Sequence, residues 1–130
     1  MTFESPRIVL VVEDEPNIVT VIRQTLRGML AEVISAESGE IGLEKARSVR
    51  PDLILLDLAL PGMSGWDLLE KLKAEGLDIP VVIVTAHGDS KTALQASEAG
   101  ACEFLTKPFK PAELRRVVAE HVFPDASRIA

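Results

Sequence analysis

Short apolar runs recur along the chain and alternate with longer segments of helical periodicity. Three runs are apolar at every position and rich in β-branched residues, at 8–12, 53–56 and 81–84. Continuous runs of this length are typical of central strands in a parallel sheet, which helices cover on both faces. Two weaker runs, at 32–36 and 102–105, predict strands nearer the sheet edges.

The segments between the runs predict helices. In the first of them, one helical face carries four apolar residues: Ile18, Ile22, Leu26 and Met29. Pro16 precedes this face, at a position where a first helical turn tolerates proline. The remaining helices are predicted at 38–47, 64–75, 90–99 and 111–122.

The sequence signals for the helix ends and for the apolar helix faces differ in strength. Ser38 suits the N-cap of the second helix, and Gly76 suits the stop of the third. The fourth helix offers mostly alanine beside Leu94, so its apolar stripe is thin. The last helix has a fuller stripe at helical spacing: Leu114, Val117, Val118, His121 and Val122.

Five alternations of strand and helix predict one fold class, an α/β domain with an open parallel sheet and right-handed crossovers. In such sheets, ligands bind beyond the carboxyl ends of the strands, close to the point where the strand order reverses. Candidate chemistry is therefore expected in the segments directly after the strands.

Composition narrows the class of protein. The chain has 130 residues, 47% of them hydrophobic, which suits one domain with a sizeable core. Its net charge of -6 argues against a nucleic-acid surface, which needs basic residues. A single cysteine, no evident secretory signal and no apolar run long enough for a membrane span predict a cytoplasmic protein.

Three acids, a hydroxyl and a lysine come after the predicted strands: Glu13, Asp14, Asp57, Thr85 and Lys107. Each has an ordinary explanation alone, because acids favour helix starts and threonine suits a strand end. Together they predict a site. Two neighbouring carboxylates repel each other unless a cation lies between them, and Mg²⁺ prefers such oxygen ligands. A phosphoryl group could then transfer to a carboxylate, with lysine and threonine binding its oxygens.

The order and spacing of these motifs resemble the receiver domains of two-component response regulators. The motifs occupy residues 11–15, 51–57, 61–65, 83–86, 100–101 and 104–109. The resemblance implies a flavodoxin-like, CheY-like fold with a five-stranded parallel sheet in the order 2-1-3-4-5 and helices on both faces. It also implies a single receiver domain over residues 1–130, with a core at about 6–123.

The resemblance assigns the acids residue by residue. Asp57 matches the phosphoacceptor and a metal ligand, and Asp14 matches a second direct ligand of Mg²⁺, for which Mn²⁺ can substitute. Glu13 matches the acid that holds the metal through water, and the backbone carbonyl of Ala59 matches the remaining protein ligand.

The remaining matches concern the phosphoryl group and the switch. Thr85 and Lys107 match the residues that bind the phosphoryl group, and Lys107 also matches a catalytic residue. A cis peptide bond to Pro108 is implied. Phe104 matches the switch aromatic, which would turn inward as Thr85 moves toward the phosphoryl group. The responding surface would be the fourth helix, fifth strand and fifth helix.

Some positions depart from the family pattern or lie outside it. Glu13 stands where many relatives have aspartate, and Ala59 cannot reach the phosphoryl group with its side chain. His87 comes shortly after Thr85, but we interpret it as a loop residue. Asp52 opens its strand at the other end of the sheet, and Asp67 also lies outside the predicted site.

The function implied is a signalling switch, not an enzyme acting on other molecules. Its partners would be a sensor histidine kinase or histidine phosphotransfer protein and an unknown target, with no direct contact to nucleic acid or membrane. A phosphorylation-dependent homodimer stays open, as does the question whether the chain is a fragment.

Three alternatives are weaker. A small-molecule phosphatase would need a second aspartate where Ala59 stands, and a nucleotide-binding fold would need a glycine-rich loop after Val12. A receiver-like interaction module that works without phosphorylation is left as the main alternative.

Overall fold

The computed structural model describes residues 6–86 and 88–123, in which strands and helices alternate. The strands are β1 (Arg7–Val12), β2 (Ala31–Ala36), β3 (Leu53–Leu56), β4 (Val81–Thr85) and β5 (Glu103–Thr106). The helices are α1 (Pro16–Thr25), α2 (Gly39–Val49), α3 (Gly65–Ala74), α4 (Ser90–Glu98) and α5 (Pro111–Val122). The predicted α/β alternation is confirmed. None of the described helices is long and apolar enough to cross a membrane.

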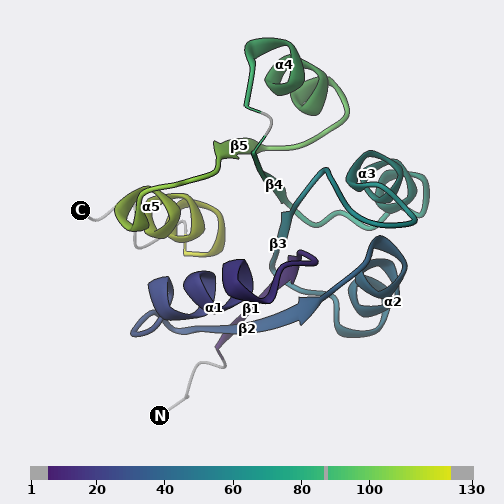
Figure 1. Ribbon diagram of the computed structural model, residues 1–130. Coiled ribbons are helices and arrows are strands. Elements are labelled where there is room, and N and C mark those ends of the chain that lie inside the picture. Colours follow the sequence, from purple (N-terminus) through teal and green to yellow (C-terminus); the bar gives the residue numbers. More distant parts are fainter. Residues whose placement is uncertain (1–5, 87, 124–130) are drawn as a thin grey trace.

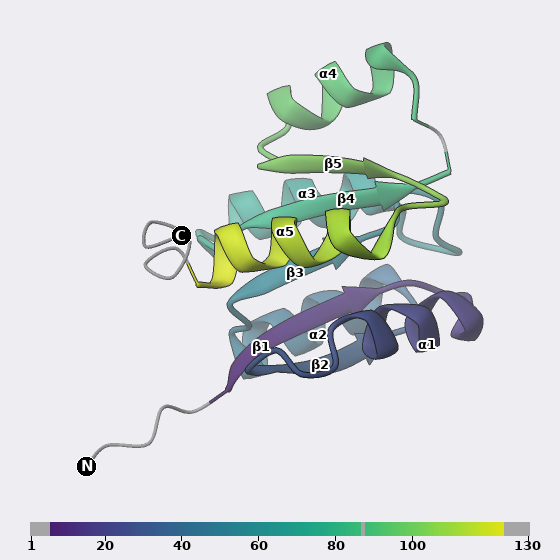
Figure 2. The ribbon, with the colours of Figure 1, turned by 90° about the vertical axis from the view of Figure 1, so that its left-hand side faces the viewer.

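The sheet has the order β2-β1-β3-β4-β5, and every neighbouring pair is parallel. This is the order that the resemblance implied. Figure 2 shows the strands side by side, running in one direction. Because they are parallel, their carboxyl ends share one edge of the sheet, and the segments after them lie along that edge.

Helices cover both faces of the sheet. Figure 1 shows α1 and α5 on one face and α2 and α3 on the other, with α4 beyond the β5 edge. Side chains of a strand alternate between its faces. Val11 of β1 therefore belongs to a cluster with Leu114 of α5, whereas Val12 belongs to a cluster with Leu68 of α3. Burial on both faces explains why the run at 8–12 is apolar at every position.

Serine caps fix the starts of two helices. The Ser38 hydroxyl accepts a hydrogen bond from the Ile41 N–H at 3.2 Å, as expected for the N-cap of α2. Ser64 likewise accepts from the Asp67 N–H, and Asp67 accepts in return from the Ser64 N–H. Gly76 comes just after α3 with φ +68°, a left-handed conformation that suits a helix stop.

The first helix is shorter than its apolar pattern predicted. It ends at Thr25, so Met29 lies in the next turn, and that part of the prediction was wrong. Gly28 adopts φ +92°, which a continuing helix does not allow. Met29 still packs against the core cluster between the sheet and the helices α1 and α5. Its apolar character therefore reflects burial in the core and not membership of a helical face.

The fourth helix is the most loosely held, as its composition predicted. Ala96 is the residue that α4 buries, and Leu94 is 60% exposed. By comparison, α3 and α5 each bury four residues against the sheet.

Candidate functional site

Lys107 joins two acids at the carboxyl edge of the sheet. Glu13 lies directly after β1, Asp57 after β3 and Lys107 after β5. The Lys107 Nζ lies 3.1 Å from Asp57 Oδ2 and 2.5 Å from Glu13 Oε1. The topology therefore brings these predicted site residues together, as the strand-end argument required.

Burial makes this ion-pair cluster electrostatically strong. Glu13 and Asp57 are 4% and 6% exposed. Burial raises the pKa of Glu13, although the hydrogen bond from Lys107 partly opposes that shift. Burial alone would lower the pKa of Lys107, but the hydrogen bond to Glu13 and the charge of Asp57 outweigh it and raise that pKa. Lys107 therefore stays an ammonium group between the two acids.

The loop after Asp57 is held close to its carboxylate. The Ala59 N–H donates a hydrogen bond to Asp57 Oδ1 at 3.1 Å. Further along, the Gly65 N–H donates to the Leu58 carbonyl. A Cβ on Gly65 would lie 2.4 Å from the Asp57 carbonyl oxygen, so only glycine permits α3 to start this close to the strand end.

Three acids form a group with the chemistry of a hard-cation site. Glu13, Asp14 and Asp57 each offer a carboxylate oxygen, and these oxygens lie within 4.8 Å of one another. Asp14 is exposed, so the group opens to solvent. An all-oxygen, anionic donor set of this kind fits Mg²⁺, which keeps several waters and takes few carboxylates.

Thr85 and Phe104 lie on the neighbouring strands. Thr85 ends β4 and is fully buried, and its carbonyl accepts a hydrogen bond from the Lys107 N–H at 2.8 Å. The peptide bond between Lys107 and Pro108 is cis, as the resemblance implied. Phe104 is partly buried and packs against the core cluster beneath α2, α3 and α4. Its role as a switch stays a prediction.

Other candidate residues lie elsewhere. Asp52 accepts a hydrogen bond from the Ile8 N–H at 2.8 Å, at the other end of the sheet. Asp67 belongs to the capping box of α3. His87 lies outside the described residues.

The direct pairing of Glu13 with Lys107 was not predicted. The family resemblance implied a water-mediated metal contact for Glu13, and the residues after the strands predicted a phosphoryl contact for Lys107. The side chains of Glu13 and Lys107 are both long and flexible. Their positions in the sequence therefore do not indicate that they meet. Packing of the β5–α5 loop against the strand ends brings them together.

Fold and site together define a doubly wound α/β domain with an acidic, lysine-bridged site at the carboxyl edge of its sheet. Residues 9–119 match the model of the response regulator receiver domain. The chain therefore belongs to the family of response regulator receiver domains.

Known relatives agree with this assignment. The chain is 40% identical over 106 residues to the DNA-binding response regulator MtrA of Mycolicibacterium smegmatis, covering 82% of this chain and 46% of MtrA. It is 38% identical to the alkaline phosphatase synthesis transcriptional regulatory protein PhoP of Bacillus subtilis, covering 82% of this chain and 44% of PhoP. The chain thus spans less than half the length of these relatives. A signal receiver domain from Vibrio parahaemolyticus superposes with a TM-score of 0.89 at 31% identity, covering 95% of each chain.

Proposed function

We propose that Asp57 accepts a phosphoryl group from a phosphohistidine, in a Mg²⁺-dependent reaction that switches the domain between two states. The carrying observation is the cluster of Glu13, Asp14 and Asp57 carboxylates within 4.8 Å, with the Lys107 ammonium 3.1 Å from Asp57. The donor would be a sensor histidine kinase or a histidine phosphotransfer protein. The domain catalyses only its own phosphorylation and dephosphorylation.

The groups at this edge of the sheet can carry out the reaction. An Asp57 carboxylate oxygen attacks the phosphorus in line, the bond from histidine nitrogen to phosphorus breaks, and an aspartyl phosphate forms. Lys107 neutralises charge on the phosphoryl oxygens, and Thr85 donates a hydrogen bond to one of them. Asp14, Asp57 and the Ala59 carbonyl would hold Mg²⁺ or Mn²⁺ directly, and Glu13 through water. The metal would supply further charge neutralisation.

The same contacts suggest how the signal spreads. A phosphoryl group on Asp57 gives Lys107 a more highly charged partner than the carboxylate it now contacts. Thr85 would move toward that group, and Phe104 would turn inward. Because α4 buries little, its displacement would require little free energy. The surface formed by α4, β5 and α5 would therefore bind the downstream target, or a second copy of the chain.

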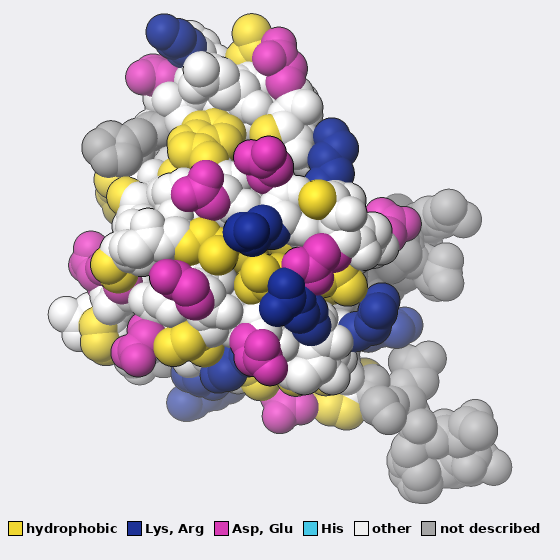
Figure 3. All heavy atoms as spheres, turned by 90° about the vertical axis from the view of Figure 1, so that its right-hand side faces the viewer, with side chains coloured by type: hydrophobic (Ala, Val, Ile, Leu, Met, Phe, Trp, Pro, Cys, Tyr) yellow, Lys and Arg dark blue, Asp and Glu magenta, His cyan; other side chains and the backbone are white. Residues whose placement is uncertain are grey.

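The charge of the molecule favours a protein target over nucleic acid. The net charge is -6. Figure 3 shows that basic side chains over α2 and α3 are interspersed with acidic ones and form no continuous stripe on that face of the described chain. Specific DNA binding needs such a basic surface. DNA binding belongs to the relative MtrA as a whole, of which this chain covers 46%. We place the domain in the cytoplasm.

Intact-mass spectrometry after incubation with acetyl phosphate tests the proposal. We expect one phosphoryl adduct that requires Mg²⁺, is labile to base and is absent from Asp57→Asn. Asp52→Asn is the matched control, because Asp52 lies at the other end of the sheet, and it should be phosphorylated like the parent chain.

The alternative function has an opposite signature. If no adduct formed with or without Mg²⁺, phosphoryl transfer to Asp57 would be refuted. The domain would then be an interaction module that works without phosphorylation.

A further inference from the structure

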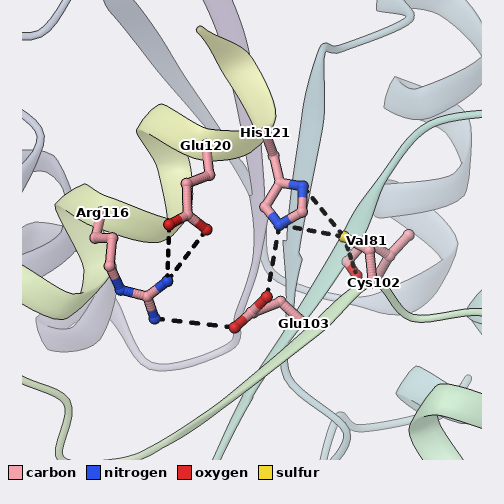
Figure 4. Close-up of polar contacts among 6 residues, drawn as sticks. All are labelled: Val81, Cys102, Glu103, Arg116, Glu120 and His121. Atoms are coloured by element: carbon pink, nitrogen blue, oxygen red, sulfur yellow. Dashed lines mark hydrogen bonds and ion pairs between the residues drawn. The ribbon is translucent and has the colours of Figure 1, made fainter. Parts of the chain in front are cut away.

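A second group of metal-binding side chains lies where α5 ends beside β5. Figure 4 shows the His121 ring between the Cys102 sulfur and the Glu103 carboxylate, with Glu120 and Arg116 alongside. Cys102 directly precedes β5, Glu103 opens it, and His121 lies in the last turn of α5. The group is therefore assembled by tertiary structure from two distant segments.

We propose that Cys102, Glu103, Glu120 and His121 form a binding site for a divalent transition-metal ion, with Zn²⁺ as the expected occupant. The site is separate from the acidic cluster at Asp57. Glu13, Asp14 and Asp57 lie past the carboxyl ends of strands, whereas Cys102 and Glu103 lie at the amino end of β5. A parallel strand of about four or five residues, roughly 15 Å, separates the two edges.

Two pairs of donor atoms lie close to the spacing that a tetrahedral ion requires. Cys102 Sγ lies 3.9 Å from His121 Nε2, and the same nitrogen lies 3.7 Å from Glu103 Oε2. Around Zn²⁺ at its usual bond lengths, tetrahedral sulfur and nitrogen ligands are about 3.6 Å apart, and nitrogen and oxygen about 3.3 Å. These two pairs have to close by only a few tenths of an ångström. Cys102 Sγ lies 3.8 Å from His121 Nδ1 and 3.9 Å from Nε2, and Cys102 is outside the group of Glu103, Glu120 and His121 whose donor atoms lie within 4.8 Å of one another. The imidazole therefore has to turn, and the sulfur has to approach the glutamates, before all four side chains bind one ion.

Glu120 supplies the fourth ligand. One oxygen of Glu120, one of Glu103 and a ring nitrogen of His121 lie within 4.8 Å of one another. Both glutamates also contact Arg116, whose guanidinium lies 3.1 Å from Glu120 and 3.9 Å from Glu103. Arg116 therefore competes with a metal for these carboxylates, and Glu120 must leave it to bind the ion.

The mixture of donors selects the kind of ion. A thiolate and an imidazole suit Zn²⁺ and similar ions, whereas Mg²⁺ and Ca²⁺ prefer all-oxygen sites. Cys102 would bind as the thiolate and release its proton to solvent. The Cys102 thiol donates a hydrogen bond to the Val81 carbonyl at 3.3 Å, and this hydrogen bond is lost when the thiolate binds the ion. The side chains of His121 and Glu103 are 23% and 32% exposed, so an ion can enter from solvent.

Titration of the whole chain with Co²⁺, a spectroscopic stand-in for Zn²⁺, tests the site in the presence of excess Mg²⁺. We expect one equivalent to give the visible absorption of four-coordinate Co²⁺ and a near-ultraviolet thiolate-to-cobalt band. Only Cys102 can give that band, because it is the only cysteine in the sequence. Zn²⁺ should then displace Co²⁺ and abolish both signals.

Matched variants assign the ligands. Cys102→Ser should remove the thiolate band, and His121→Gln and Glu103→Gln should each weaken binding at least tenfold. Arg116→Gln should strengthen binding severalfold, because it frees both glutamates. His87→Gln controls for histidine content, and Asp14→Ala with Asp57→Ala controls for the acidic cluster. Both controls should leave the thiolate band unchanged.

Several results would overturn the proposal. They are no thiolate band at saturating Co²⁺, an unchanged affinity in His121→Gln, or one metal per two chains. Circular dichroism of each variant checks its fold. If Cys102→Ser failed to fold, the band of the parent chain and its response to Glu103→Gln and Arg116→Gln would still decide the outcome.

Discussion

Lys107 neutralises negative charge at the edge of the sheet where the strands have their carboxyl ends. Its ammonium group lies between Glu13 and Asp57, two carboxylates that are almost fully buried. Removing one partner of a buried ion pair leaves an uncompensated charge, which is far more costly than the loss of a surface contact. A single side chain therefore stabilises the fold, and in the proposed function it would also bind the anionic phosphoryl group.

Replacing Lys107 with methionine should destabilise the chain by about 3 kcal/mol in the absence of divalent metal, because two buried carboxylates would then face each other. Mg²⁺ should restore part of that loss, so the metal should raise the melting temperature more in Lys107→Met than in the parent chain. Urea unfolding with EDTA or with Mg²⁺ measures both effects. Lys91→Met, on the exposed side of α4, is the control and should change neither. Equal stability of Lys107→Met and the parent in EDTA would contradict this account.

At the scale of elements, the turn from β3 into α3 determines where Asp57 can lie. Gly65 begins α3 directly against the Asp57 backbone, and Ser64 caps the helix just before it. Gly76 ends the same helix with φ +68° and nothing within 4 Å of an added Cβ. The two glycines are thus needed for different reasons, close approach at one end and left-handed backbone at the other.

These two positions give a matched comparison by alanine substitution. Gly65→Ala should destabilise the chain by about 3 kcal/mol, since its Cβ meets rigid backbone that cannot move aside. Gly76→Ala should cost only about 1 kcal/mol, the penalty of the left-handed conformation. Gly65→Ala should also slow phosphorylation of Asp57, whereas Gly76→Ala should not. Equal losses in urea unfolding would show that the close approach relaxes freely.

At the scale of the whole molecule, the sheet couples its two helical layers. Val11 and Val12 are neighbours in β1, yet one packs beneath α1 and α5 and the other beneath α2 and α3. A substitution that weakens packing on one face therefore also destabilises a strand against which the helices of the other face pack. Such sharing predicts a single cooperative unfolding transition.

Leu114→Ala tests this coupling from the α5 side. It should lower the free energy of unfolding by about 3 kcal/mol, because Leu114 is fully buried in α5. Trp66, the only tryptophan, packs on the opposite layer. Its fluorescence should nevertheless shift to the same midpoint as circular dichroism. Leu94→Ala, at a residue that is 60% exposed, is the control. An unmoved Trp66 transition would mean that the layers unfold separately.

Much of the architecture was predictable because the pattern of apolar residues in the sequence reflects which faces of each strand and helix are buried. The continuous runs at 8–12, 53–56 and 81–84 indicated the central strands, since both faces of those strands are covered. The end of α1 was missed because Met29 is apolar for reasons of core packing and not of helix membership. The predicted strand ends were enough to identify Asp57 and Lys107 as residues of one site, because residues at the carboxyl ends of parallel strands lie along one edge of the sheet.

Contacts between long side chains were decided by the tertiary structure alone. Neither the direct pairing of Lys107 with Glu13 nor the meeting of Cys102 with His121 has a spacing rule in the sequence. Periodicity determines which face of an element is buried. Which rotatable polar groups then touch depends on how loops and helix ends pack against one another in three dimensions.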